Sequence, residues 1–91
     1  MLNIEWTRAA RQDLAEIVGF IANDNPLAAR KMKVLIMEAV TPAARHPRIF
    51  RRGRVDGTHE IPLHPHYLLV YQVLETHIRA LRVLHTRRQY P

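Results

Sequence analysis

The sequence predicts an α+β fold with the element order β-α-α-β-β-β, in which an α-helical hairpin packs on a mainly antiparallel sheet. Residues 2–6 alternate between apolar and polar side chains, which is the period of a half-buried strand. Residues 7–45 carry two stretches with helical periodicity separated by a break, and residues 58–85 are rich in valine, leucine and tyrosine. No repeat and no second domain is evident, so a single domain spanning residues 1–91 is expected.

The first helix is predicted to begin after Thr7, whose hydroxyl can accept a hydrogen bond from an amide of the first turn. Its apolar positions recur at helical spacing and share one face. They are Ala10, Leu14, Ile17, Val18 and Ile21. Residues 23–26, Asn-Asp-Asn-Pro, end this helix. There Asn25 is a good N-cap and Pro26 takes the first helical position, so a second helix begins.

The second helix has one apolar side and one mainly polar side. The apolar side consists of Ala28, Met32, Leu35, Ile36, Ala39 and Ala43, and the other of Arg30, Lys33 and Met37. Thr41-Pro42 weakens the end of this helix and His46-Pro47 finishes it, because the residue before a proline disfavours helical conformation. Two such helices cannot bury both apolar faces by themselves, so a sheet must lie beneath the hairpin.

A basic loop and three strands follow the helices. The loop, residues 45–57, contains Arg45, Arg48, Arg51, Arg52 and Arg54. Residues 58–63 begin a strand that Pro62 keeps short or at an edge. Residues 66–74 are typical of a strand buried on both faces, and residues 78–85 return antiparallel after a turn. Since the helices cover one face of the sheet, the other is predicted to be exposed or to bind a partner.

Composition limits the classes of protein to which the chain can belong. Fourteen Lys and Arg against eight Asp and Glu give a net charge of +6, and twelve of the fourteen are arginine, which suits bidentate contacts to phosphate or carboxylate. Cysteine is absent, which excludes disulfides and thiolate metal sites and fits a reducing cytosol. The N-terminal segment does not resemble a signal peptide, and the longest apolar run, residues 67–71, is too short to cross a bilayer. We therefore expect a soluble, cytoplasmic protein.

The last ten residues carry the strongest functional signal. A strand leads there into a cluster of side chains that can donate protons, hold anions or stack. The cluster consists of Arg82, His85, Arg87, Arg88 and Tyr90. A chain terminus frays easily and is under weak selection for packing. The cluster is therefore predicted to bind a target, such as a phosphate backbone or an acidic protein surface.

An ordered set of short motifs runs along the whole chain. It comprises Trp6-Thr7, Ala10, Asp13-Leu14, Ile17, residues 21–26, His46-Pro47, Arg52-Gly53-Arg54-Val55, Gly57-Thr58-His59-Glu60, Pro65-His66-Tyr67, Leu69-Val70-Tyr71 and residues 81–91. With this set the chain resembles the RelE/ParE superfamily of toxins from type II toxin–antitoxin modules, and its closing segment is most similar to the ParE branch. The resemblance implies a RelE/ParE-like fold and a growth-inhibiting toxin. It also implies a hetero-oligomer with a cognate antitoxin, ParD-like or RelB-like.

The resemblance implies two alternative targets. ParE-like members poison DNA gyrase, whereas RelE-like members cut messenger RNA on the ribosome, and one fold serves both. RNA cleavage needs a base for the 2′-hydroxyl, an acid for the leaving oxygen and cations for the phosphate. Arg82, His85 and Tyr90 could supply these groups, but Arg82 and His85 should leave opposite faces of a strand. The two lysines, Lys31 and Lys33, fall on the second helix.

These observations favour the ParE-like interpretation, a plasmid-stabilisation toxin that inhibits gyrase and has no catalytic residue of its own. The alternative is a RelE-like ribosome-dependent mRNA endonuclease, with Arg82, His85 and Tyr90 as catalytic residues, so the sequence leaves open whether the chain is an enzyme. A third interpretation is a small basic nucleic-acid binder without toxicity, in which the arginine-rich loop contacts the ligand.

The candidate residues at the C-terminus also have structural interpretations. His85 could bond a backbone carbonyl, and Tyr90 could pack its ring against the sheet edge. Arg82 lies in an apolar strand and would be costly to bury alone, so it needs either a partner, with Glu60 across the sheet as the candidate, or an open groove.

Three histidines raise the question of a metal site. His64 and His66 share one side of an extended segment, and His59 could provide a third ligand. The proline between the first two and the lack of a nearby acid argue against such a site. No metal and no cofactor is expected.

The antitoxin is expected to contact surfaces where adaptable apolar side chains lie near arginines. A disordered antitoxin segment can fold onto such a surface as a helix or a strand, and its acidic residues would pair with the arginine excess. We predict contacts along the helical hairpin, the outer sheet face and the basic loop, at Leu27, Met37, Arg51, Arg52 and Arg54.

Overall fold

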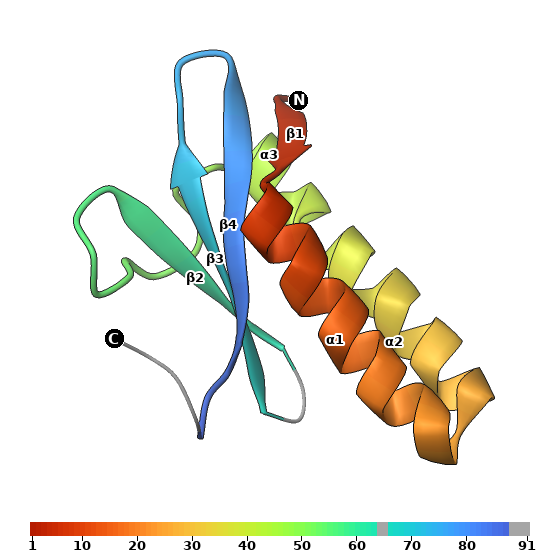
Figure 1. Ribbon diagram of the computed structural model, residues 1–91. Coiled ribbons are helices and arrows are strands. Elements are labelled where there is room, and N and C mark those ends of the chain that lie inside the picture. The colour runs from red at the N-terminus through yellow and green to blue at the C-terminus, as the bar shows by residue number, and fades with distance from the viewer. Residues whose placement is uncertain (64–65, 88–91) are drawn as a thin grey trace.

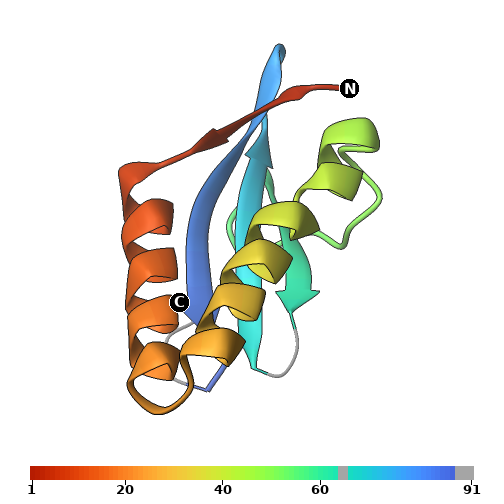
Figure 2. The ribbon, with the colours of Figure 1, turned by 90° about the vertical axis from the view of Figure 1, so that its right-hand side faces the viewer.

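A helical hairpin covers one face of a four-stranded sheet in the computed structural model, which describes residues 1–63 and 66–87 (Figure 1). The elements are β1 (Asn3–Trp6), α1 (Arg8–Asp24), α2 (Pro26–Ala39), α3 (Thr41–Arg45), β2 (Thr58–Leu63), β3 (Tyr67–Val73) and β4 (His77–His85). Figure 2 looks onto the helical layer, with α1 and α2 in front of the strands. The predicted α+β architecture is confirmed.

The sheet is mixed and has the strand order β1-β4-β3-β2. β1 pairs parallel with β4, whereas β4 with β3 and β3 with β2 are antiparallel. β2 is an edge strand, as Pro62 predicts, because proline has no amide hydrogen for a second neighbour. The helical hairpin connects β1 to the rest of the sheet, which allows a parallel pairing that no tight turn can make.

Both predicted helix starts are confirmed. The hydroxyl of Thr7 accepts from the Ala10 amide at 3.0 Å and donates to the Leu81 carbonyl at 2.9 Å, so one side chain caps α1 and ties it to β4. Asn25 serves both helices: its amide donates to the Ile21 carbonyl, and its side chain accepts from the Ala28 amide at 3.0 Å. Short polar side chains at these positions satisfy amides and carbonyls that a helix end otherwise leaves unpaired.

The main core lies between the helices and the inner sheet face. Its fully buried members include Ile36, Val40, Leu69, Tyr71 and Ile78. The hydroxyl of Tyr71 donates to the Pro47 carbonyl at 2.7 Å, and burial raises the pKa of Tyr71 to about 12, so this donor keeps its proton at neutral pH. A smaller cluster on the outer face contains Leu68, Val70 and Leu84.

The structure corrects two expectations about the second helix. α2 ends at Ala39, and Ala43 belongs to the separate short helix α3, because Pro42 cannot continue a helix interior but is tolerated in a first turn. Leu35 was expected on the buried side but is 46% exposed. Ala29, Ile36 and Val40 form the buried line of the helix, and Leu35 lies about 100° around the axis from Ile36.

Candidate functional site: the β4 end, the basic loop and the helical hairpin

A β-bulge at Leu81 determines which way the side chains at the end of β4 point. Val70 of β3 is opposite Arg82, but the next residue, Tyr71, is opposite Ala80, so Leu81 has no partner in the ladder. The extra residue shifts the alternation of side chains along the strand. Arg82 consequently stands on the outer face with Val70, whereas Val83 joins the core beneath the helices.

Arg82 is held by Asp13 of α1 in a two-pronged ion pair. Its Nε donates to Asp13 Oδ2 at 2.7 Å and its terminal nitrogen to Oδ1 at 3.1 Å, while Oδ2 also accepts from the Val83 amide at 2.9 Å. The hydrogen bond to Asp13 raises the pKa of Arg82 above its usual value. The Arg82 side chain is 46% exposed and that of Asp13 is 13% exposed. Arg82 therefore presents a fixed, permanently charged group at the surface.

The expected Arg82–Glu60 pair is wrong, although the two residues do lie in one row across the sheet. Both are opposite Val70, on either side of β3, and Glu60 accepts from Arg51 at 2.9 Å. β1 pairs with β4 only as far as Ala80, so α1 borders the rest of that edge, and Asp13 reaches Arg82 from there. Arg82 is thus not a buried arginine.

His85 lies on the opposite sheet face from Arg82, as their spacing predicts, and lines a cleft between α1 and the sheet. It is opposite Tyr67, with ring centroids 5.3 Å apart in an edge-on arrangement. Its Nδ1 accepts from the Arg87 amide at 3.2 Å. Glu16 and Phe20 also line this cleft of about 320 Å³, as does Asp13, which links it to Arg82.

The end of β4 is fixed to the preceding hairpin up to residue 86. The amide and hydroxyl of Thr86 both donate to the His66 carbonyl, at 2.7 and 3.1 Å. Arg87 follows on the surface. Arg88 and Tyr90, the two remaining residues of the predicted target-binding cluster, lie outside the described residues. The structure thus places Arg82, His85 and Arg87 at one end of β4, with Arg82 and His85 directed to different faces.

The basic loop includes an ordered extension of the sheet that the sequence did not predict. The Glu60 amide donates to the Arg51 carbonyl at 3.0 Å, the Gly53 amide donates to the Thr58 carbonyl at 2.9 Å, and Arg52 forms an isolated antiparallel bridge with His59. Gly53 is the signal that could have revealed this contact, because a Cβ there would lie 2.3 Å from the Thr58 hydroxyl.

The outward side of α2 presents apolar side chains between cations. Leu27 and Met37, both predicted to contact the antitoxin, are 56% and 46% exposed. Sequence reasoning missed Val34, which is 53% exposed and lines a shallow groove with Leu35 and the cationic Arg30 and Lys31. The seven-residue spacing from Leu27 to Val34 could have identified this stripe.

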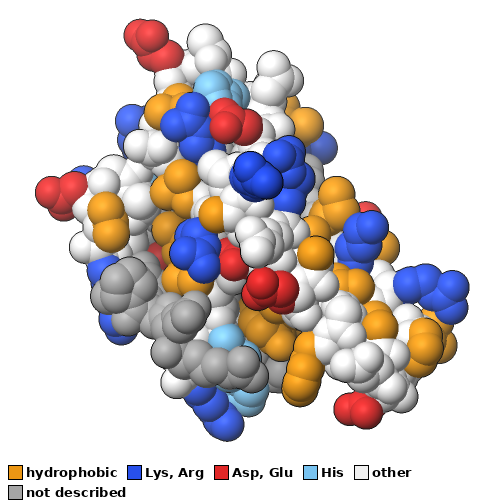
Figure 3. Space-filling model, in the orientation of Figure 1, with side chains coloured by type: hydrophobic (Ala, Val, Ile, Leu, Met, Phe, Trp, Pro, Cys, Tyr) orange, Lys and Arg blue, Asp and Glu red, His pale blue; other side chains and the backbone are white. Residues whose placement is uncertain are grey.

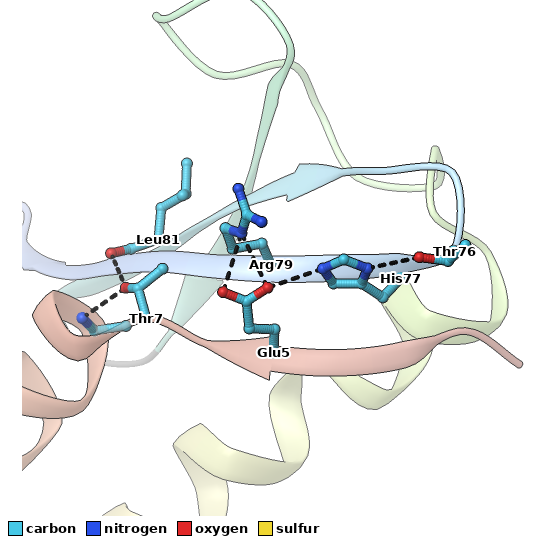
Figure 4. A network of polar contacts seen from close by, with 7 residues as sticks. Glu5, Thr7, Thr76, His77, Arg79 and Leu81 are labelled. Carbon is cyan, nitrogen blue, oxygen red and sulfur yellow. Dashed lines mark hydrogen bonds and ion pairs between the residues drawn. The ribbon is translucent and has the colours of Figure 1, made fainter.

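A polar network that the sequence analysis missed joins β1 to β4 (Figure 4). Glu5 is opposite Arg79, and each of its carboxylate oxygens accepts a hydrogen bond from Arg79 Nε at 3.1 Å. His77 Nε2 lies 2.8 Å from Glu5 Oε1. The hydrogen bond from Arg79 lowers the pKa of Glu5 most, and the one with His77 lowers it further. Figure 4 shows Thr76 continuing the line, with its hydroxyl 2.9 Å from His77 Nδ1. The network stabilises a parallel pairing of only four residues.

Cationic side chains do not gather into one continuous patch on the face seen in Figure 3, where they alternate with apolar and acidic groups. The candidate surfaces must therefore be distinguished by geometry rather than by charge alone. Over residues 1–63 and 66–87, no three His, Asp or Glu side chains are grouped as metal ligands. In the same part of the chain, no helix has the length and apolar character needed to span a membrane.

Comparison with known proteins assigns the family. Residues 4–90 match the family model of the ParE toxin of the type II toxin–antitoxin system parDE. Protein Y4kP of Sinorhizobium fredii is 34% identical over 97% of this chain and 92% of its own length. Toxin RelE2 of Caulobacter vibrioides is 30% identical over 97% of this chain and 99% of its own. The chain belongs to the ParE toxin family, within the RelE/ParE superfamily that the sequence motifs indicate.

Solved structures agree with this assignment. A chain of the chromosomal ParDE toxin–antitoxin system of P. aeruginosa superimposes with a TM-score of 0.82 and 26% identity, covering 93% of this chain and 96% of the other. A chain of the DinJ-YafQ complex of E. coli has a TM-score of 0.54 and 16% identity over the full length of both chains. At that identity the second match supports the fold alone.

Proposed function

We propose that this toxin is a ParE-like inhibitor of DNA gyrase that acts in the cytoplasm and is neutralised by a cognate antitoxin. The observation that carries the proposal is the match of residues 4–90 to the ParE model, together with the high structural similarity to the ParDE system. The toxin carries out no bond chemistry in this proposal. It binds the gyrase state in which DNA is cleaved more tightly than the other states, and differential binding shifts the population toward that state.

The end of β4 is the proposed target-binding surface. Arg82 and Arg87 provide surface cations, and Arg82 is held rigidly by its contact with Asp13. A prepositioned guanidinium loses less side-chain entropy on binding than a mobile one. We assign His85, Arg88 and Tyr90 to the same surface on the basis of their sequence position. Acidic side chains or DNA phosphates on the gyrase–DNA complex would contact it.

The antitoxin is proposed to cover the helical hairpin and the basic loop. Leu27 and Met37 supply exposed apolar contacts on α2, and Arg51, Arg52 and Arg54 supply surface cations on the loop. An acidic segment that folds on binding could span both regions, with its apolar side on α2 and its carboxylates toward the loop. Formation of this complex would neutralise the toxin, and such a toxin–antitoxin pair could serve plasmid stabilisation.

A RelE-like ribonuclease is the alternative function. The observation that favours it is the cleft that places His85, Tyr67 and Glu16 around one space, since these are groups that can act as acids or bases. The 30% identity with toxin RelE2 also supports considering this alternative. In that mechanism one group takes the 2′-hydroxyl proton and another protonates the leaving 5′-oxygen. The phosphate would need a cation other than Arg82, which is directed to the other sheet face.

A paired assay decides between the two functions. Purified toxin is added to a gyrase supercoiling reaction and, separately, to a translation extract with labelled message. We expect loss of supercoiling, accumulation of cleaved DNA and intact RNA. Codon-phased cuts in the message together with normal supercoiling would overturn the gyrase proposal. The Arg82→Gln and Arg87→Gln variants should weaken gyrase inhibition, with circular dichroism as the control for folding.

A further inference from the structure

The basic loop borders a recess at the β2 side of the sheet, away from the β4 end. The recess has a volume of about 670 Å³ and is lined by Arg48, Phe50, Arg52, His59 and Val73, among others. Its walls combine several cationic side chains with aromatic and aliphatic ones and with one acid, Asp56. A site with this composition can receive a ligand that has both an anionic and an apolar part.

Two arginines of the recess have no ion-pair partner among the described residues. Arg51 donates to Glu60, but neither Arg48 nor Arg52 forms an ion pair with any residue in the described part of the chain. Arg52 bridges His59 in the antiparallel pairing, so the two side chains leave the sheet on the same face. The recess therefore contains two exposed guanidinium groups that no ion pair among the described residues engages, and Asp56 is the one acid that lines it with them.

His59 and Phe50 form an aromatic wall of the recess around Tyr71. The His59 ring stacks on Tyr71 with centroids 5.3 Å apart and an interplanar angle of 19°, while Phe50 meets Tyr71 edge-on at 6.3 Å. The Nδ1 atom of His59 is buried and has no hydrogen-bond partner among the described residues. Because this atom is shielded from solvent, it is not itself a contact for a ligand, and His59 contributes to the recess as part of an aromatic wall.

We propose that this recess binds the phosphate backbone of duplex DNA. Two guanidinium groups offer more donors than a single carboxylate can accept, and the guanidinium fork matches the oxygens of a phosphate. Phe50 and Val73 provide an apolar wall for a sugar, which an acidic side chain would not need. The choice of DNA over RNA rests on the proposed gyrase function. In this arrangement the toxin contacts the DNA that gyrase holds as well as the enzyme.

Binding of a fluorescein-labelled duplex of about 20 base pairs, measured by anisotropy at several salt concentrations, tests the inference. The test variant is Arg48→Gln/Arg52→Gln. The control is Arg8→Gln/Arg11→Gln, which removes the same two charges from the +6 chain at exposed positions on α1. We expect the test variant to bind about tenfold more weakly, with a salt slope smaller by about 2, and the control to stay within about twofold of wild type.

Three outcomes would overturn the inference. The first is that wild-type protein has no measurable affinity for the duplex at low salt, and the second is that both double variants lose the same amount of DNA affinity. The third is that polyglutamate of matched charge binds as tightly as the duplex and depends on Arg48 and Arg52 to the same degree. The last result would identify an acidic protein as the ligand. Gyrase inhibition is measured on the same preparations, because inhibition by a toxin that does not bind DNA would sink this inference while leaving the proposed function intact.

Discussion

Two edges of the sheet are closed by different means. Along β4 beyond the end of β1, side chains of α1 and its N-cap close the edge. The Thr7 hydroxyl donates a hydrogen bond to the Leu81 carbonyl, and the Asp13 carboxylate accepts one from the Val83 amide. Along β2, backbone closes the edge through the segment from Arg51 to Gly53. Both devices cover unpaired backbone groups that would otherwise favour pairing with other chains.

The two kinds of closure engage arginine side chains to different degrees. At the β4 edge the closing carboxylate also binds Arg82, so part of that guanidinium is already engaged within the domain. At the β2 edge the backbone makes the contacts and does not engage the charge of Arg52. Counting arginines in the sequence therefore does not tell how many of them lack an internal ion pair on the folded surface.

Replacing Asp13 should have the largest effect, because one side chain performs two functions at the β4 edge. Asp13→Ala removes the acceptor for the part-buried Val83 amide and the partner of Arg82, and we expect a loss of about 2–3 kcal/mol in the free energy of unfolding. Urea denaturation measures the loss. Asp24→Ala, an exposed residue at the end of α1, is the matched control and should change stability by less than about 0.5 kcal/mol.

The outcome also tests whether side-chain closure is essential at this edge. An Asp13→Ala variant as stable as Asp24→Ala would show that the Val83 amide and Arg82 find other partners. Asp13→Asn sharpens the comparison, because an amide oxygen can still accept from Val83 without compensating the charge of Arg82. Its stability should fall between those of wild type and Asp13→Ala.

A methyl group at Gly53 should disturb the backbone closure of the β2 edge. Its Cβ would lie 2.3 Å from the Thr58 hydroxyl, which cannot rotate away without losing its hydrogen bond to the Val55 carbonyl. We expect Gly53→Ala to destabilise the domain by about 1–2 kcal/mol, the range for overpacking. Thermal denaturation followed by circular dichroism measures it.

Gly19 provides the matched control for Gly53. A Cβ there meets no atom within 4 Å, and the residue lies inside α1. Gly19→Ala should therefore stabilise the domain by about 0.5–1 kcal/mol, since alanine has the higher helix propensity. If both alanine variants shift the midpoint in the same direction, the close approach of the loop to β2 is not a constraint on stability.

The sequence predicted the elements of the fold whose causes are local. Caps at Thr7 and Asn25 and the edge position of Pro62 follow from the chemistry of one residue and its near neighbours. The Arg82–Asp13 pair joins residues 69 positions apart and depends on the bulge at Leu81 and the early end of β1. Neither feature has a local signal, so the sequence indicated Glu60 as the partner instead.

The exposure of the candidate antitoxin-binding side chains could be predicted only where its cause is local. Exposure of Leu27 and Met37 follows from helical periodicity, whereas Leu35 lies at the boundary of the apolar face, where hydrophobicity alone does not determine the side. The recess beside His59 could not be predicted, because it requires the loop to fold back along β2. Its orphaned nitrogen is a property of the packed structure and has no counterpart in composition.

The smallest predicted effect concerns pH and the four-residue pairing of β1 with β4. Arg79 and His77 lower the pKa of Glu5 below its ordinary value of 4.5. A carboxyl group whose pKa is lowered by folding contributes stability above the unfolded pKa, and this contribution is lost as the pH falls through the folded value. Glu5→Gln should therefore be slightly less stable than wild type at pH 7, and the difference should shrink once the pH falls below 4.5 and disappear below the folded-state pKa.

Denaturation midpoints of both proteins at pH 7 and at acidic pH measure this difference. Salt should reduce it at pH 7, because the carboxylate is exposed and its partners are screened. A difference that persists unchanged into acid would mean that Glu5 acts through packing or hydrogen bonding in its neutral form. In that case the pairing of β1 with β4, like the closure of the β2 edge, would not depend on the charge of a carboxylate.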